Sequence, residues 1–137
     1  MKISQKSEYA LRAILDLSLH PPEDLVKLSG IAERQEIPRK FLELIFASLR
    51  QGGLVETRRG REGGYRLARP ADRITVGDVL AVVGSERGER RAAQDAFTDM
   101  WTRADESLSA IIDRTTFADL VERWKLTKTK YIPNWEI

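Results

Sequence analysis

Apolar residues recur at helical spacing twice in the first half of the chain, with polar residues between them. The pattern predicts a first helix over residues 7–19, which Ser7 caps. A short helix over 29–34, which Ser29 caps, precedes a third helix over 38–51. The apolar side of the third helix consists of Leu42, Ile45, Phe46 and Leu49. The first half of the chain is therefore expected to be helical up to the glycine pair after residue 51.

Two short strands are expected directly after this glycine pair. Residues 54–58 and 65–68 have strand composition, and the glycine-rich segment 59–64 between them is typical of a hairpin turn. Helix, turn, helix and hairpin over residues 29–68 form the pattern of a winged helix-turn-helix. The sequence thus predicts a mainly α fold with a small β-hairpin wing.

The second half of the chain shows helical periodicity again. Thr75 and Asp78 resemble a capping box for a helix that ends near Val83. A longer apolar face spans residues 95–113, and a final helix is expected from Thr116 to Trp124. The segment 125–137 has no periodicity, so an extended or partner-dependent tail is expected there.

Composition narrows the possible functions. The 137 residues include no cysteine and one histidine, which excludes disulfides, thiol nucleophiles and thiolate-held metal sites. No nucleophile–base pair can be assembled from the chain, so an enzyme is not expected. Neither a signal peptide nor a membrane span is recognisable, and a cytoplasmic protein is expected.

Charge is distributed unevenly along the chain. The net charge is +2, but residues 1–70 carry 13 Lys and Arg against 9 Asp and Glu, whereas residues 71–137 carry 10 against 12. Six arginines and two glutamates lie in the segment 50–69. A basic patch of this kind suits an anionic partner, and a solvated surface of mixed charge is the alternative.

The third helix carries polar residues that its apolar side does not need. Arg39 and Lys40 can donate hydrogen bonds to guanine, and Glu43 can accept one from cytosine. Ser29 and the helix N-terminus add donors to phosphate. These residues are candidates for DNA contacts in a major groove.

The hairpin supplies a second candidate contact. Arg58, Arg59 and Arg61 surround Gly60, which allows the backbone to approach a sugar–phosphate wall closely. Arginines at such a tip commonly enter the minor groove. A helical hairpin with a basic surface loop is the alternative interpretation, but the wing after the second helix favours DNA binding.

Four segments carry a family resemblance: Tyr9-Ala10-Leu11, Ile31-Ala32-Glu33-Arg34-Gln35, Phe41-Leu42-Glu43 and Arg59-Gly60-Arg61-Glu62-Gly63-Gly64-Tyr65-Arg66-Leu67-Ala68-Arg69. With them, the chain resembles the Rrf2 family of bacterial winged helix-turn-helix regulators, from Ile3 to about Trp124. The resemblance implies a homodimer on double-stranded DNA with a pseudo-palindromic operator. It also implies DNA contacts from Arg39, Lys40, Phe41, Glu43, Arg59, Gly60 and Arg61.

The resemblance further implies that the long helix packs against its copy in the dimer. The apolar face of that helix comprises Phe97, Met100, Trp101, Ala104, Leu108, Ile111 and Ile112. The expected organisation is a DNA-binding domain over 1–83, a linker over 84–94, dimerisation helices over 95–124 and a tail over 125–137.

The sequence departs from cluster-binding relatives in the sensor region. Those relatives place three cysteines in and after the loop before the long helix, where this chain has none and Asp95 stands at the last position. Some relatives also use an acidic residue that Glu8 matches, although Glu8 is better interpreted as a helix-start charge. Carboxylates alone do not hold an iron–sulphur cluster, so neither a cofactor nor a metal is expected.

The sequence therefore predicts a homodimeric, sequence-specific transcription regulator without a cluster, and we expect a repressor. A protein-interaction co-regulator that has lost its sensor and docks onto an enzyme or another regulator is the alternative. The Lys-rich tail with Trp135 favours that alternative. A small-molecule effector, a protein effector or no effector all stay open.

Overall fold

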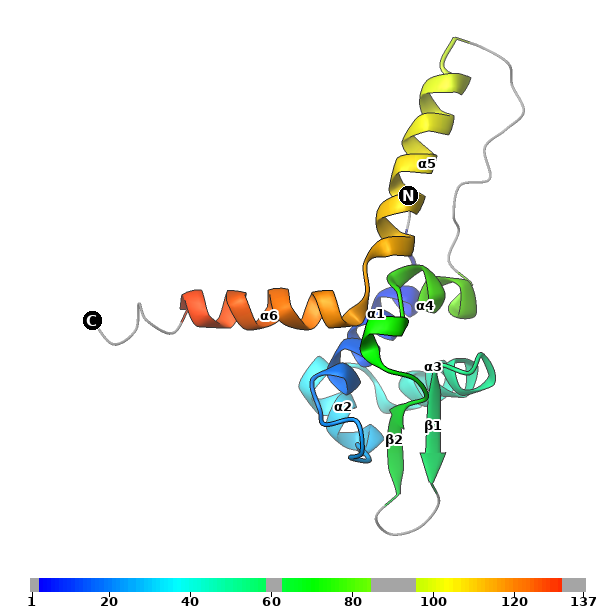
Figure 1. The fold of residues 1–137 in the computed structure, drawn as a ribbon. Coiled ribbons are helices and arrows are strands. Elements are labelled where there is room, and N and C mark those ends of the chain that lie inside the picture. Colours follow the sequence, from blue (N-terminus) through cyan, green and yellow to red (C-terminus); the bar gives the residue numbers. More distant parts are fainter. Residues whose placement is uncertain (1–2, 59–62, 85–95, 132–137) are drawn as a thin grey trace.

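The computed structural model describes residues 3–58, 63–84 and 96–131, with side chains as far as residue 128. The described elements are α1 (Gln5–Ser18), α2 (Leu28–Gln35), α3 (Arg39–Gln51), β1 (Val55–Arg58), β2 (Gly64–Leu67), the 3-10 turn η1 (Ala71–Arg73), α4 (Val76–Val83), α5 (Thr98–Arg114) and α6 (Phe117–Tyr131). Helices α1 to α4 and the hairpin form the body, from which α5 and α6 project in different directions (Figure 1). The predicted fold class, a mainly helical winged helix-turn-helix with a small hairpin, is confirmed.

The core of the body lies between α1, α3 and α4. On α3, all four residues of the predicted apolar side are buried: Leu42, Ile45, Phe46 and Leu49. The Phe46 ring meets Tyr65 of β2 edge to face, with ring centroids 4.6 Å apart. This contact fixes the base of the hairpin against the helix that precedes it.

Two predicted helix caps are wrong. Ser4 rather than Ser7 caps α1, because the Ser7 backbone N–H donates to Ser4 Oγ at 3.1 Å and Ser7 is fully buried in the first turn. Ser29 does not cap α2, whose N-cap is Lys27 without a side-chain hydrogen bond. The chain pairs with β2 through Val26 immediately before Lys27, so α2 starts earlier than its serine.

The wing is tied to the loop between α1 and α2. Strands β1 and β2 are antiparallel, and Val26 forms a further bridge with Tyr65 through two backbone hydrogen bonds of 2.8 Å. A Cβ atom at Gly64 would lie 2.7 Å from the Val26 carbonyl oxygen, so this close approach requires glycine. Residues 59–62, which include the predicted tip, lie outside the described residues.

The beginning of α6 is part of the same body. The predicted capping box of α4 (Thr75 with Asp78) is confirmed, and Thr116 and Asp119 form a second capping box at the start of α6. Thr75 and Thr116 form a bridge, and the Phe117 N–H donates to the Ile74 carbonyl oxygen at 3.0 Å. The side chain of Phe117 is fully buried in the core. The first turn of α6 therefore packs with the DNA-binding domain predicted for residues 1–83.

The expected extended tail from residue 125 is wrong as far as Tyr131, because α6 continues to that residue. An exposed helix needs no apolar period, and no glycine or proline interrupts α6 before Pro133. Lys128 Nζ lies 4.7 Å from the Trp124 ring centroid, a cation–π contact along the helix. None of the described helices is long and apolar enough to cross a membrane.

Candidate nucleic-acid interface

The N-terminal half of α3 presents charged side chains to solvent. Arg39, Lys40 and Glu43 are all exposed, and Arg39 Nε lies 3.7 Å from Glu43 Oε1. Because the opposite side of α3 is buried in the core, these three side chains share the face that an approaching partner meets. The structure thus brings together the three polar residues of this helix that were predicted to contact bases.

The other residues predicted to contact DNA differ in their exposure to solvent. Ser29 is exposed in the first turn of α2, and Arg58 is exposed at the end of β1. Phe41 is only half-buried, and its ring meets Tyr9 of α1 edge to face at 5.5 Å. Arg59, Gly60 and Arg61 lie outside the described residues.

The turn between α2 and α3 sets the angle between these two helices. Glu36 adopts a left-handed conformation with φ 53°, which a non-glycine residue takes at a cost of about 1 kcal/mol. The buried Ile37 follows, and its N–H donates to the Ala32 carbonyl oxygen at 3.0 Å. Core burial and this hydrogen bond stabilise the turn although Glu36, and not a glycine, occupies the left-handed position.

A buried carboxylate joins α1 to the end of α2. The side chain of Asp16 is 3% exposed and accepts hydrogen bonds from Arg34 Nε at 2.9 Å, Arg34 Nη2 at 2.8 Å and Gln35 Nε2 at 3.0 Å. His20 Nε2 lies 3.3 Å from Asp16 Oδ1, so the histidine is oriented by this carboxylate. The sequence pattern missed Asp16, because a single acidic residue in an apolar face gives no local signal of its partners.

The environment of Asp16 also sets its protonation. Burial raises the pKa of the Asp16 carboxyl, but the hydrogen bonds from Arg34 and Gln35 together lower it by more than burial raises it. The pKa of Asp16 therefore lies below its ordinary value of 3.8. The carboxylate is therefore charged at neutral pH. Its hydrogen bonds fix the end of α2 against α1, and α3 follows directly after the turn.

Replacing Asp16 with asparagine should lower the free energy of unfolding at pH 7 by about 1–3 kcal/mol, because buried charge-assisted hydrogen bonds are lost. Because the pKa of Asp16 is lower in the folded state than in the unfolded chain, its carboxylate stabilises the fold fully above the ordinary value of 3.8. This stabilisation decreases as the pH falls below 3.8 toward the folded-state pKa. Urea unfolding of wild type and Asp16→Asn between pH 7 and pH 3 should therefore show a difference that shrinks with acid.

Glu8 provides the matched control for this experiment. It lies on the same helix and pairs with Arg12 at 2.8 Å, but both side chains are about half exposed. Glu8→Gln should change the free energy of unfolding by less than about 0.5 kcal/mol. Equal effects of Glu8→Gln and Asp16→Asn at pH 7 would contradict a structural role for the buried carboxylate.

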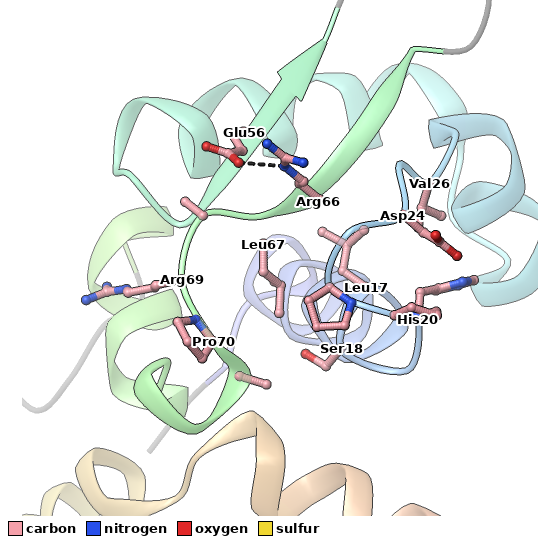
Figure 2. Close-up of a pocket in the computed structure, with 14 residues that line it drawn as sticks. Leu17, Ser18, His20, Asp24, Val26, Glu56, Arg66, Leu67, Arg69 and Pro70 are labelled. Carbon is pink, nitrogen blue, oxygen red and sulfur yellow. Dashed lines mark hydrogen bonds and ion pairs between the residues drawn. The ribbon is translucent and has the colours of Figure 1, made fainter.

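A hollow of about 360 Å³ lies where the end of α1 meets the base of the wing (Figure 2). Leu17, Val26 and Leu67 contribute to its apolar walls. Two arginines at its edge already have acidic partners. Arg66 Nε lies 2.6 Å from Glu56 Oε1, and Arg69 Nη2 lies 3.9 Å from an oxygen of Asp78. Since both arginines are paired, the geometry alone assigns no ligand to this hollow.

Helix α5 presents an apolar strip to solvent. Five large side chains of this strip are 38–64% exposed, and with the exposed Ala104 they make up the set Phe97, Met100, Trp101, Ala104, Leu108 and Ile111. Ile112, the seventh predicted dimer residue, does not belong to the strip. It is buried against Gly77 of α4 in the same chain, because the base of α5 packs on α4.

The donor groups of the chain do not fit an iron–sulphur cluster. The sequence contains no cysteine, and within the described residues no three His, Cys, Asp or Glu side chains form a group that could hold a metal ion. Glu8 pairs with Arg12, and Asp95 lies outside the described residues.

Comparison with known proteins matches residues 3–123 to the model of the Rrf2 family, described as iron-dependent transcriptional regulators. The transcriptional regulator IscR of Erwinia tasmaniensis is 35% identical over 139 residues, covering 92% of this chain and 82% of that protein. The solved structure of CymR, the global cysteine regulator of B. subtilis, matches with a TM-score of 0.82 at 30% identity, covering 90% of this chain and 98% of CymR. The IscR structure of T. potens matches with a TM-score of 0.78 at 36% identity, covering 90% and 88%. These relatives are regulators rather than enzymes.

Proposed function

The chain belongs to the Rrf2 family of DNA-binding transcriptional regulators, and from this premise we propose that it is a homodimeric, sequence-specific repressor of the cytoplasm. The observation that carries the proposal is the exposed charged face at the N-terminal half of α3, the second helix of the helix-turn-helix. Its operator is a pseudo-palindrome, because each protomer of a two-fold dimer reads one half-site.

DNA recognition in this proposal depends on α3 and the wing. Arg39 and Lys40 donate to guanine or phosphate in the major groove, and Glu43 accepts from cytosine. The ion pair between Arg39 and Glu43 has to open for both contacts, which costs little because both side chains are more than half exposed. Arg58 extends the contact toward the wing, and Ser29 faces the phosphates.

The apolar strip of α5 supports the homodimer. Two copies that pair along this strip form the proposed dimer, and their α3 helices have to lie about 34 Å apart to enter successive major grooves. DNA binding in this regulator does not depend on a cluster, because the chain lacks the thiolates that such a group requires.

Titration of labelled DNA, selected from a random library with the full-length protein, tests the proposal directly. We expect saturable binding whose affinity falls with salt, as phosphate contacts release counterions. Arg39→Ala should weaken binding about tenfold, the effect of one lost base or phosphate contact. Arg123→Ala, which removes an exposed arginine of α6, is the matched control and should leave affinity nearly unchanged.

Two results would overturn the proposal. One is the absence of any saturable, salt-dependent DNA binding. The other is co-purification with a stoichiometric protein partner and no DNA preference, which would favour the co-regulator hypothesis instead.

A further inference from the structure

The exposed face of α3 carries a large apolar side chain among its charges. Leu44 is 67% exposed, and it is not part of the buried core of the body. It follows Lys40 by four residues and precedes Ala47 by three, so these three exposed residues form one stripe along the helix. The stripe lies on the side of α3 opposite Leu42 and Leu49 in the core. An aliphatic group thus occupies the centre of the face that meets the partner.

The chemistry of the major groove identifies what such a group can contact. Of the base edges in that groove, only thymine presents an apolar group, the C5-methyl. The neighbouring Lys40 and Glu43 meet polar edges or phosphates, whereas a leucine offers neither a donor nor an acceptor. Removing a methyl group and a leucine side chain from water together is favourable, so the contact distinguishes thymine from cytosine.

We propose that Leu44 is a specificity residue that contacts the C5-methyl of a thymine in each operator half-site. This inference rests on the proposed function, since it requires α3 to enter the major groove. One helical turn separates Leu44 from Lys40, a rise of about 6 Å. The thymine should therefore lie within about two base pairs of the base or phosphate that Lys40 contacts.

Single-base substitution with 2′-deoxyuridine tests the proposal, because it removes the methyl group and keeps every hydrogen-bonding group of thymine. The probe is an operator duplex selected from a random library with the full-length protein, and each thymine is replaced in turn. At one thymine of each half-site, the substitution should weaken wild-type binding about fourfold, the effect of one buried methyl group. Leu44→Ala should bind thymine and deoxyuridine duplexes equally at that position.

The matched control is Leu126→Ala, which truncates a leucine of similar exposure, 64%, on α6. This variant should keep the fourfold preference for thymine. The inference is overturned if no thymine is sensitive to loss of its methyl group, or if Leu44→Ala retains the preference. In both cases, saturable binding of the selected duplex would leave the proposed function standing. Failure to select or bind any duplex would overturn the proposed function itself, and the inference with it.

Discussion

Replacing Phe117 with alanine is expected to lower the free energy of unfolding by about 3–5 kcal/mol. The side chain is fully buried, and it lies in the core cluster of the body although it begins a helix that projects from it. Truncation would leave a cavity between α1, α6 and η1, which neighbouring backbone cannot fill. The Phe117 N–H is held by Ile74, and the adjoining Thr116 is paired with Thr75. Urea unfolding followed by circular dichroism measures the difference.

Leu126→Ala is the control on the same helix, because the leucine is mostly exposed and its loss should change stability by no more than about 0.5 kcal/mol. Unfolding at two protein concentrations distinguishes the loss of a core contact from the loss of a dimer contact, because dimer contacts make the apparent stability depend on protein concentration. Phe117 packs within one chain, so the difference should be the same at both concentrations. A Phe117→Ala effect below about 1 kcal/mol would show that α6 does not belong to the core.

The sequence predicts elements well where the signal is local. The four apolar residues of α3 are spaced so that only one side of a helix can be buried, and all four are buried. Thr75 and Asp78 satisfy each other within one turn, so their capping box needs no information from the rest of the chain. The hairpin is likewise defined by a short glycine-rich segment between two strands.

The start of α2 and the role of Asp16 depend on contacts between distant segments, which the local sequence pattern does not show. The start of α2 follows from the pairing of Val26 with Tyr65, nearly forty residues away, which outweighs the capping preference of Ser29. The role of Asp16 depends on Arg34, eighteen residues later. The sequence alone does not distinguish Ser4 from Ser7 as the N-cap of α1, because the side chain of either serine can accept a helix N–H. Long-range pairing of this kind leaves no periodic trace.

In the candidate site, too, some residues could be predicted from local sequence and others could not. Arg39, Lys40 and Glu43 could be assigned to one exposed face because they are the residues that the apolar side of α3 does not use. Leu44 was missed because it lies outside the apolar stripe and carries no polar group that would suggest a contact, and its exposure in the structure is the first sign of a role. Ile112 was assigned to the dimer for the opposite reason, since burial against α4 cannot be distinguished from burial in a partner by spacing alone.

The apolar strip of α5 shows the seven-residue repeat that is typical of helices that pair with another helix. Phe97, Ala104 and Ile111 follow one another at intervals of seven residues, which keeps an apolar seam on one side of two associated helices. The helix projects from the body and packs on α4 near its base, so the strip is exposed in the single chain (Figure 1). A large apolar surface of this kind is typical of a protein–protein interface.

Met100→Glu or Ile111→Glu should therefore disrupt the proposed homodimer, because pairing would bury a charge on each protomer without a partner. Operator affinity should fall more than a hundredfold, since a single half-site loses the effective concentration supplied by its neighbour. Sedimentation and DNA titration measure the two effects. Thr102→Glu, exposed on the opposite side of α5, adds the same charge and should change neither. A dimer that survives both strip variants would show that the protomers associate through another surface, and equal loss of affinity with Thr102→Glu would attribute the effect to charge alone.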